Sequence, residues 1–187
     1  MKKISLLLAA VMVSVSTFAQ TWSIDKAHAK VAFTITHLSI SEVDGTFKNF
    51  DATLTSSKED FSDAKFVLSA DIKGIDTNME MRNGHLQGES WFNAEKFPQL
   101  TYKSTSLTSV GPKKFKLNGD LTMKGVTKPV VMDLTLIGTT KGRDGKNIVG
   151  FKASGTLDRT AFGVGGAGPT PVDNTVELRV SGEFKAQ

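Results

Sequence analysis

Apolar and polar residues alternate through almost the whole chain, and this alternation restricts the possible folds more than any other feature. The clearest run places Phe115, Leu117, Gly119, Leu121 and Met123 at every second position, with lysines and other polar residues between them. A period of two sends successive side chains to opposite faces of a β-strand. Each such strand therefore has one buried face and one solvated face, as in an antiparallel sheet.

The same period recurs in several other segments. They span residues 31–36, 64–72, 130–136, 149–157 and 176–185. Segments with turn-forming composition separate them, and many evenly spaced antiparallel strands are typical of a closed barrel or of a two-sheet sandwich. We predict an all-β antiparallel barrel, and the sandwich remains the alternative.

Glycines within or beside the predicted strands favour the barrel. They are Gly119, Gly138, Gly150, Gly155 and Gly182. Interior glycines of this kind mark bends at barrel corners or places where a ligand comes close. An eight-stranded barrel is wide enough to hold one small ligand, but periodicity does not distinguish a filled barrel from a hollow one.

One segment departs from the strand pattern. Thr77 and Glu80 are spaced as a capping box, in which each side chain bonds the other residue's backbone N–H. A short helix would follow to about residue 86 and stop at Gly88. Such a helix is a lid or plug that places Arg82 and His85 one turn apart. Arg82 then either faces the polar end of a ligand or pairs with a carboxylate on the barrel rim.

The N-terminus has the features of a secretory signal. Lys2 and Lys3 precede an apolar run over residues 4–15, and small residues follow up to Ala19. This run is too short to span a bilayer, and no cysteine follows it for lipid attachment. We predict a signal peptide over residues 1–19 and one domain over residues 20–187, soluble in the periplasm or secreted.

Charge and cysteine content exclude several function classes. Removing the signal takes two lysines from 23 basic residues and leaves 19 acidic ones unchanged, so the net charge falls from +4 to +2. The basic residues are scattered, and therefore we predict no nucleic-acid partner. The chain has no cysteine, which rules out disulfides, thiol catalysis and thiolate metal sites.

No pattern of catalytic or metal-binding residues stands out. His28 and His37 lie nine residues apart and would face opposite sides of one strand, and His85 lies far along the chain. Acids such as Asp76, Glu80 and Asp158 lie near turns and caps, where acids are expected in any protein. The glycine-rich run 162–169 lacks the ending of a phosphate loop, and we interpret it as a flexible loop at the barrel mouth. We predict no catalytic residue, no metal site and no cofactor.

Four blocks of residues, taken together in their order and spacing, resemble the YceI-like family of periplasmic lipid-binding barrels. They are His37-Leu38 with Gly45, Phe47 and Phe50; Ile75-Asp76-Thr77 with Arg82, His85-Leu86, Trp91-Phe92-Asn93 and Phe97-Pro98; Gly119-Asp120-Leu121-Thr122 with the run from Gly125 to Val130; and Leu157-Asp158-Arg159-Thr160 with Phe162-Gly163. The resemblance extends from about Thr21 to Phe184. Asn83, Lys124 and Ala161 depart from the family pattern, at places that bear on polar contacts with a ligand.

The resemblance implies a lipocalin-like barrel with an apolar tunnel for a long isoprenoid chain, such as a quinone or a polyprenyl phosphate. It implies non-enzymatic carriage or storage of that lipid, and some relatives take fatty acids or their amides instead. The candidate mouth residues are Arg82 and His85. The candidate tunnel residues, chosen by their inward parity, are Phe33, Ile35, Phe66, Leu68, Leu121, Met123, Met132, Leu134, Phe151 and Phe184.

Two partner interactions stay open at this stage, namely a transient contact with a membrane surface and a homodimer. The alternative function is that of a secreted β-sandwich that recognises protein or carbohydrate. A protein of that kind would expose aromatic platforms, and the chain has one Tyr and two Trp.

Overall fold

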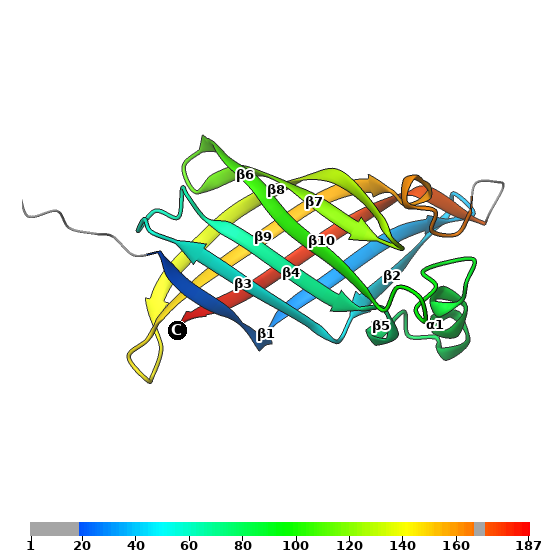
Figure 1. Cartoon of the computed structure of the whole chain (residues 1–187), viewed down its shortest axis with the longest axis horizontal. Coiled ribbons are helices and arrows are strands. Elements are labelled where there is room, and N and C mark those ends of the chain that lie inside the picture. The colour runs from blue at the N-terminus through cyan, green and yellow to red at the C-terminus, as the bar shows by residue number, and fades with distance from the viewer. Residues whose placement is uncertain (1–18, 167–170) are drawn as a thin grey trace, which may run out of the picture.

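A computed structural model describes residues 19–166 and 171–187, and these residues form one closed sheet with a short helix at one end (Figure 1). The strands are β1 Gln20–His37, β2 Ser41–Phe47, β3 Phe50–Ser56, β4 Lys65–Asp71, β5 Ile75–Asp76, β6 Gln99–Gly111, β7 Lys114–Met123, β8 Val126–Lys141, β9 Asn147–Asp158 and β10 Val172–Ala186. The helices are η1 Ile72–Gly74, α1 Glu80–Gln87 and η2 Arg159–Phe162. Apart from residue 19, the expected signal peptide lies outside the described residues, as do residues 167–170 of the glycine-rich run.

The barrel closes because the first and last long strands pair with each other. The strands pair antiparallel in the order β10-β9-β8-β7-β6-β4-β3-β1, and β1 also pairs with β10, from Trp22 opposite Ala186 to His37 opposite Val172. β2 and β3 act as two halves of one strand, since β2 pairs with the end of β1 and β3 with its start. The result is an eight-stranded antiparallel barrel, as predicted, and the closure excludes the sandwich.

The inward faces of the strands match the predicted alternation. In β7, Phe115, Leu117, Leu121 and Met123 are each no more than 5% exposed, while Lys114, Lys116 and Asp120 are in solvent. The segments of turn-forming composition at Gly111-Pro112, at Gly125 and over residues 143–146 join β6 to β7, β7 to β8 and β8 to β9. Within the described part of the chain, no helix has the length and apolarity needed to span a bilayer.

Three of the strand glycines, Gly119, Gly138 and Gly182, lie beside shifts in the strand register, as expected for bends. Gly119 lies beneath the ring of Tyr102 on the neighbouring strand, and a Cβ on Gly155 would lie 2.7 Å from Sδ of Met132. Side chains of the barrel itself therefore fill the space above Gly119 and Gly155. Gly182 is covered in the same way by Ile24.

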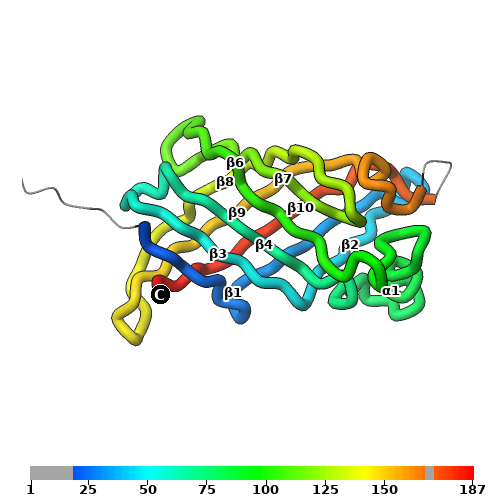
Figure 2. Tube along the Cα trace, in the orientation of Figure 1, coloured from blue at the N-terminus to red at the C-terminus, as the bar shows by residue number. Residues whose placement is uncertain are grey.

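The two ends of the barrel differ in what covers them. The trace in Figure 2 places α1, the β1–β2 turn and η2 at one end, which we call the mouth end. The β3–β4 loop over residues 57–64, the β6–β7 turn, the β8–β9 hairpin and the C-terminus lie at the opposite end (Figures 1 and 2).

The helix is present, but the predicted capping box is wrong. α1 begins at Glu80, so its N-cap is Met79, and no side chain caps it. Thr77 lies two residues too early to cap, and its hydroxyl bonds Asn83 instead, at 2.7 Å. The stop at Gly88 is confirmed, since the N–H of this residue bonds the carbonyl of His85.

Candidate functional site

A cavity of about 390 Å³ occupies the barrel interior and reaches the mouth end. Alternate residues of every long strand form its wall, and side chains from α1 and η2 reach it at the mouth. The wall is overwhelmingly apolar. Phe33 and Ile35 of β1 are buried only in part, although they point inward, because they face this open space.

An aromatic cluster ends the cavity toward the opposite end of the barrel. Phe66, Phe151 and Phe184 belong to the wall and pack edge to face, with Phe66 and Phe151 ring centroids 5.2 Å apart. Beneath them Phe61 packs on Phe151 at 5.6 Å and on Trp22 at 5.4 Å. Phe61 and Trp22 are buried and lie outside the wall. This cluster forms the floor of the cavity.

All ten predicted tunnel residues lie on the cavity wall. They are Phe33, Ile35, Phe66, Leu68, Leu121, Met123, Met132, Leu134, Phe151 and Phe184. Their shared parity explains this outcome, since every inward residue of a closed barrel faces the same interior. Contact between these side chains and a ligand stays a prediction.

The two predicted mouth residues also line the cavity. Arg82 is half-buried, and its guanidinium donates from Nε to the Thr77 hydroxyl at 2.8 Å and from Nη2 to the Thr77 carbonyl at 2.6 Å. The ion pairs of the described residues do not include Arg82, and its guanidinium bonds go to Thr77 rather than to a carboxylate on the rim. His85 is exposed and reaches the cavity from the next turn of α1.

Asn83, one of the departures from the family pattern, holds this segment together. Its side-chain carbonyl accepts from the backbone N–H of Thr77 at 2.8 Å, and its amide donates to Asp76 at 3.2 Å. Asp76 also forms an ion pair with Lys48 at 2.7 Å. The Lys48 ammonium and the hydrogen bonds from Asn78 and Asn83 lower the pKa of Asp76 to about 2. Asp76 is therefore ionised and anchors the segment, and an acid with so low a pKa is poorly suited to proton donation.

Arg159 is a buried cation that the sequence patterns did not single out as a site residue. It is 3% exposed, and it donates to the backbone carbonyls of Asp173 at 2.9 Å and Val164 at 2.7 Å. Its guanidinium lies 5.2 Å from the centre of the Trp91 ring. Burial lowers the pKa of Arg159. One arginine in a turn gives no sequence signal of burial, so only the folded chain shows that it ties η2 to the start of β10.

The ionisable groups of the wall are all bases or a phenol. They are Lys30, His37, Arg82, His85, Arg159 and Tyr102. Within the described residues no Asp or Glu lines the cavity. Burial raises the pKa of Tyr102 to about 12, so its hydroxyl is neutral. This lining suits an apolar chain with a neutral or anionic polar end, because nothing on the wall would compensate a buried cation.

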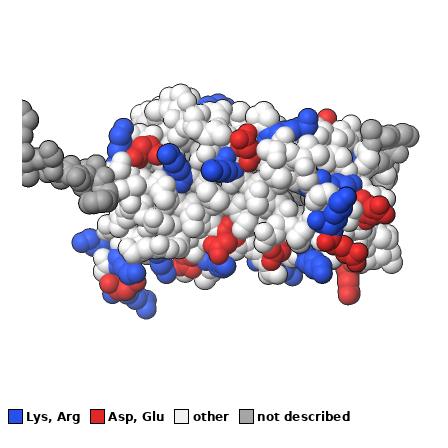
Figure 3. All heavy atoms as spheres, in the orientation of Figure 1, with Lys and Arg blue, Asp and Glu red and all other residues white. Residues whose placement is uncertain are grey.

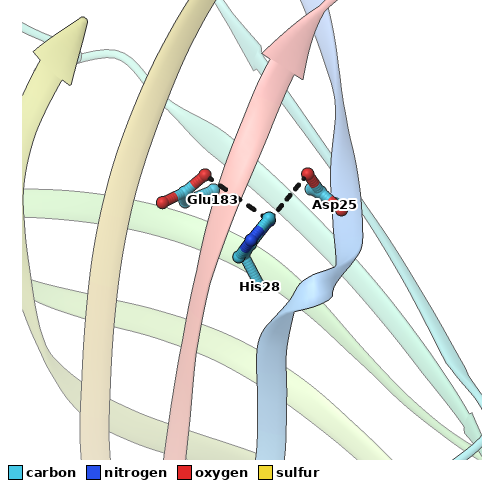
Figure 4. A group of neighbouring side chains, drawn as sticks. All are labelled: Asp25, His28 and Glu183. Carbon is cyan, nitrogen blue, oxygen red and sulfur yellow. Dashed lines mark hydrogen bonds and ion pairs between the residues drawn. The ribbon is translucent and has the colours of Figure 1, made fainter. Parts of the chain in front are cut away.

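A polar cluster outside the cavity is shown in Figure 4. Nδ1 of His28 lies 3.0 Å from Asp25 and 3.9 Å from Glu183, which reaches across from β10. The ammonium of Lys185 lies 2.8 Å from the same Asp25 oxygen that faces His28. The cluster is therefore a network of surface ion pairs. The Lys185 ammonium already pairs with the Asp25 carboxylate, which a metal ion bound here would need as a ligand. His37 lies elsewhere, on the cavity wall.

Comparison with known proteins agrees with this geometry. The YceI-like domain model matches residues 22–184. Protein YceI of Salmonella newport is 37% identical over 170 residues, which cover 90% of this chain and 88% of that protein. The crystal structure of a Campylobacter jejuni YceI protein superposes with a TM-score of 0.71 at 26% identity, covering 100% of this chain and 99% of that one.

A more distant structure shares the fold. It is a polyisoprenoid binding domain from Saccharophagus degradans implicated in plant cell wall breakdown, with a TM-score of 0.67 at 12% identity. The match covers 91% of this chain and 100% of that domain. From the family model and the identity to Protein YceI, the chain belongs to the YceI-like domain family.

Proposed function

We propose that this protein binds a long-chain lipid of the polyisoprenoid class inside the barrel, and carries or stores it without changing it chemically. The observation that carries the proposal is the apolar cavity, which is floored by aromatic rings and bordered at its mouth by basic groups. The polyisoprenoid binding domain from Saccharophagus degradans has the same fold and supports this class of ligand.

The energetics of transfer fit a carrier. Burying apolar chain contributes about 0.8 kcal/mol per CH₂ relative to water, so a long tail alone would saturate any realistic affinity. The competing environment is a membrane, however, and lipid tails there are equally apolar. Exchange with a membrane is therefore nearly balanced for the tail, and contacts at the mouth decide which lipid binds.

The mouth favours a neutral or anionic polar end. Arg82 and His85 line it from α1, and no described acid faces the cavity. A charge-assisted hydrogen bond from Arg82 suits a phosphate or carboxylate, and a quinone carbonyl would accept a bond as well. We propose a quinone or a polyprenyl phosphate as ligand, located in the periplasm after export by the predicted signal peptide.

Native mass spectrometry of the purified mature protein, followed by lipid extraction, tests the proposal. We expect a bound lipid with an isoprenoid tail, recovered unchanged after incubation. Leu121→Trp should abolish its capture while the fold survives, because the larger side chain obstructs the cavity. Val131→Trp is the matched control, since Val131 is exposed on the outer wall. The cavity is excluded as the site if lipid is retained by folded Leu121→Trp, Phe151→Trp and Met132→Trp proteins. Extraction of a straight-chain fatty acid or amide from the native protein would exclude the isoprenoid class.

A further inference from the structure

The mouth end carries exposed apolar side chains on two separate segments. Leu38 and Ile40 lie on the β1–β2 turn, and Met79 and Met81 lie at the start of α1. Ile40 is 84% exposed and Met81 is 70% exposed, the highest values among the large apolar residues of the described chain. Figure 1 shows both segments at the same end of the barrel. None of the four side chains lines the cavity or belongs to the core.

The β1–β2 turn is also strained. Leu38 and Ser39 both have left-handed backbone angles, with φ of 50° and 60°. This conformation favours glycine and asparagine, and other residues adopt it at a cost in conformational free energy. The Leu38 side chain adds little to offset this cost, because it is 59% exposed. The backbone N–H of Leu38 bonds the carbonyl of Pro171 at 2.7 Å, which holds the turn in place.

These exposed side chains adjoin the cavity opening. His37, which precedes Leu38, and Arg82, which follows Met81, both line the cavity. The ionisable groups of the cavity wall are basic and complement the phosphates of a lipid head group, whereas the exposed Glu80 lies between Met79 and Met81. Elsewhere charge is mixed, and Figure 3 shows acidic and basic side chains intermixed on the visible face of the barrel. Long-range attraction to an anionic surface is therefore weak, and apolar insertion is the main contribution to binding.

We propose that the β1–β2 turn and the start of α1 insert into the surface of a lipid bilayer and dock the mouth of the barrel against it. The ligand then passes between bilayer and cavity without crossing water. The docking surface consists of Leu38, Ile40, Met79 and Met81. The transfer step rests on the proposed function, whereas docking itself is measured independently of any ligand in the cavity.

Single-cysteine labelling of the mature protein tests the docking directly, because the chain has no native cysteine. Ile40→Cys and Met81→Cys proteins carry an environment-sensitive fluorophore and are mixed with phosphatidylcholine vesicles. We expect a blue shift at both positions. The control is Ile137→Cys on β8, which is 60% exposed and lies toward the β8–β9 hairpin, away from the mouth. No shift at Ile40, or an equal shift at all three positions, would overturn the proposal.

Vesicle flotation gives the second measurement. The double variant Leu38→Ser, Ile40→Ser should lower partitioning at least about tenfold, since the apolar area that inserts is removed. Ile137→Ser should leave it unchanged. Unchanged partitioning of the double variant would refute docking. A dimer that shields the Ile40 label in the absence of vesicles would assign this face to self-association and refute docking as well.

Leu121→Trp separates the two proposals. We expect this variant to float with vesicles as the native protein does, although its cavity is blocked. If the native protein and the variant both float with vesicles but neither contains extractable lipid in its cavity, the proposed function is refuted and docking stands. Lipid in the native cavity without flotation would refute docking and leave lipid binding in place.

Discussion

Arg82 shows how one side chain serves both the fold and the site. It lines the cavity, yet two of its hydrogen bonds go to Thr77, at 2.8 and 2.6 Å. Those bonds fix the direction of the guanidinium before any ligand arrives. A pre-oriented cation at an apolar opening distinguishes lipids by the charge of their polar end.

Arg82→Ala should therefore weaken binding of an anionic lipid by roughly 1.5–3 kcal/mol and leave an uncharged lipid of the same tail almost unaffected. Competition binding with a matched pair, a polyprenyl phosphate and the corresponding alcohol, measures both. If both lipids weaken equally, Arg82 acts through Thr77 and the fold, and a direct contact with the ligand is refuted.

His28 gives a prediction of pH dependence outside the cavity. The hydrogen bond with Asp25, together with the charge of this carboxylate, raises the pKa of His28 above its ordinary 6.5. Folding therefore favours the protonated ring. The resulting stabilisation is fully present below pH 6.5 and disappears as pH rises through the raised pKa.

Titration of the His28 ring protons by NMR measures this pKa. Asp25→Asn should bring it back toward 6.5, because both main causes of the shift are removed. Glu183→Gln should lower it less, since the Glu183 carboxylate lies 3.9 Å from the ring. An equal fall in both variants would contradict the assignment to Asp25.

At the scale of elements, the segment from Thr77 to α1 is attached to the barrel by few interactions. α1 has no buried residue, whereas Thr77 beneath it is 3% exposed and bonds both Arg82 and Asn83. A segment with so little buried apolar surface opens at low free energy. It has the properties of a lid over the cavity, and Thr77 is its main attachment.

Thr77→Val should destabilise the closed segment by about 1–3 kcal/mol, because Arg82 and Asn83 lose a buried partner. We expect faster amide hydrogen exchange in α1 and unchanged exchange in β7 and β8. Thr127→Val is the matched control, since Thr127 is exposed on β8. Faster exchange throughout the barrel would show that Thr77 supports the whole fold rather than a local lid.

At the scale of the whole molecule, the aromatic floor decides how much of the barrel is hollow. Phe61 comes from the β3–β4 loop and closes the interior between Phe151 and Trp22. Phe61→Ala should lower the free energy of unfolding by about 3–5 kcal/mol, as expected for a fully buried phenylalanine. Urea denaturation measures the loss, and Val110→Ala, an exposed site in β6, should change little. A loss no greater than that of the control would mean that the floor adds little to the packing.

Much of the fold was predictable because it depends on short-range periodicity. Alternation in β7 and in the other long strands indicated which side chains point inward, and so Leu121, Met132 and Phe151 were correctly placed on the wall. The error at Thr77 has an equally local cause. A capping box matches four residues, but Asn78 takes a left-handed φ of 59° and delays the helix start to Glu80.

The sequence by itself determined the strands with clear alternation and their inward faces, and it indicated a short helix at Arg82, because each follows from the chemistry of residues a few positions apart. Strands β2, β3 and β6 lacked so clear a pattern. Only the tertiary structure decided that the barrel is hollow at its mouth end and filled at its floor. Those features depend on Phe61, Trp22 and Arg159, which come from distant segments and meet only when β1 pairs with β10 and closes the sheet. Periodicity specifies which way a side chain points, whereas packing across the closed barrel decides whether another side chain or empty space lies opposite.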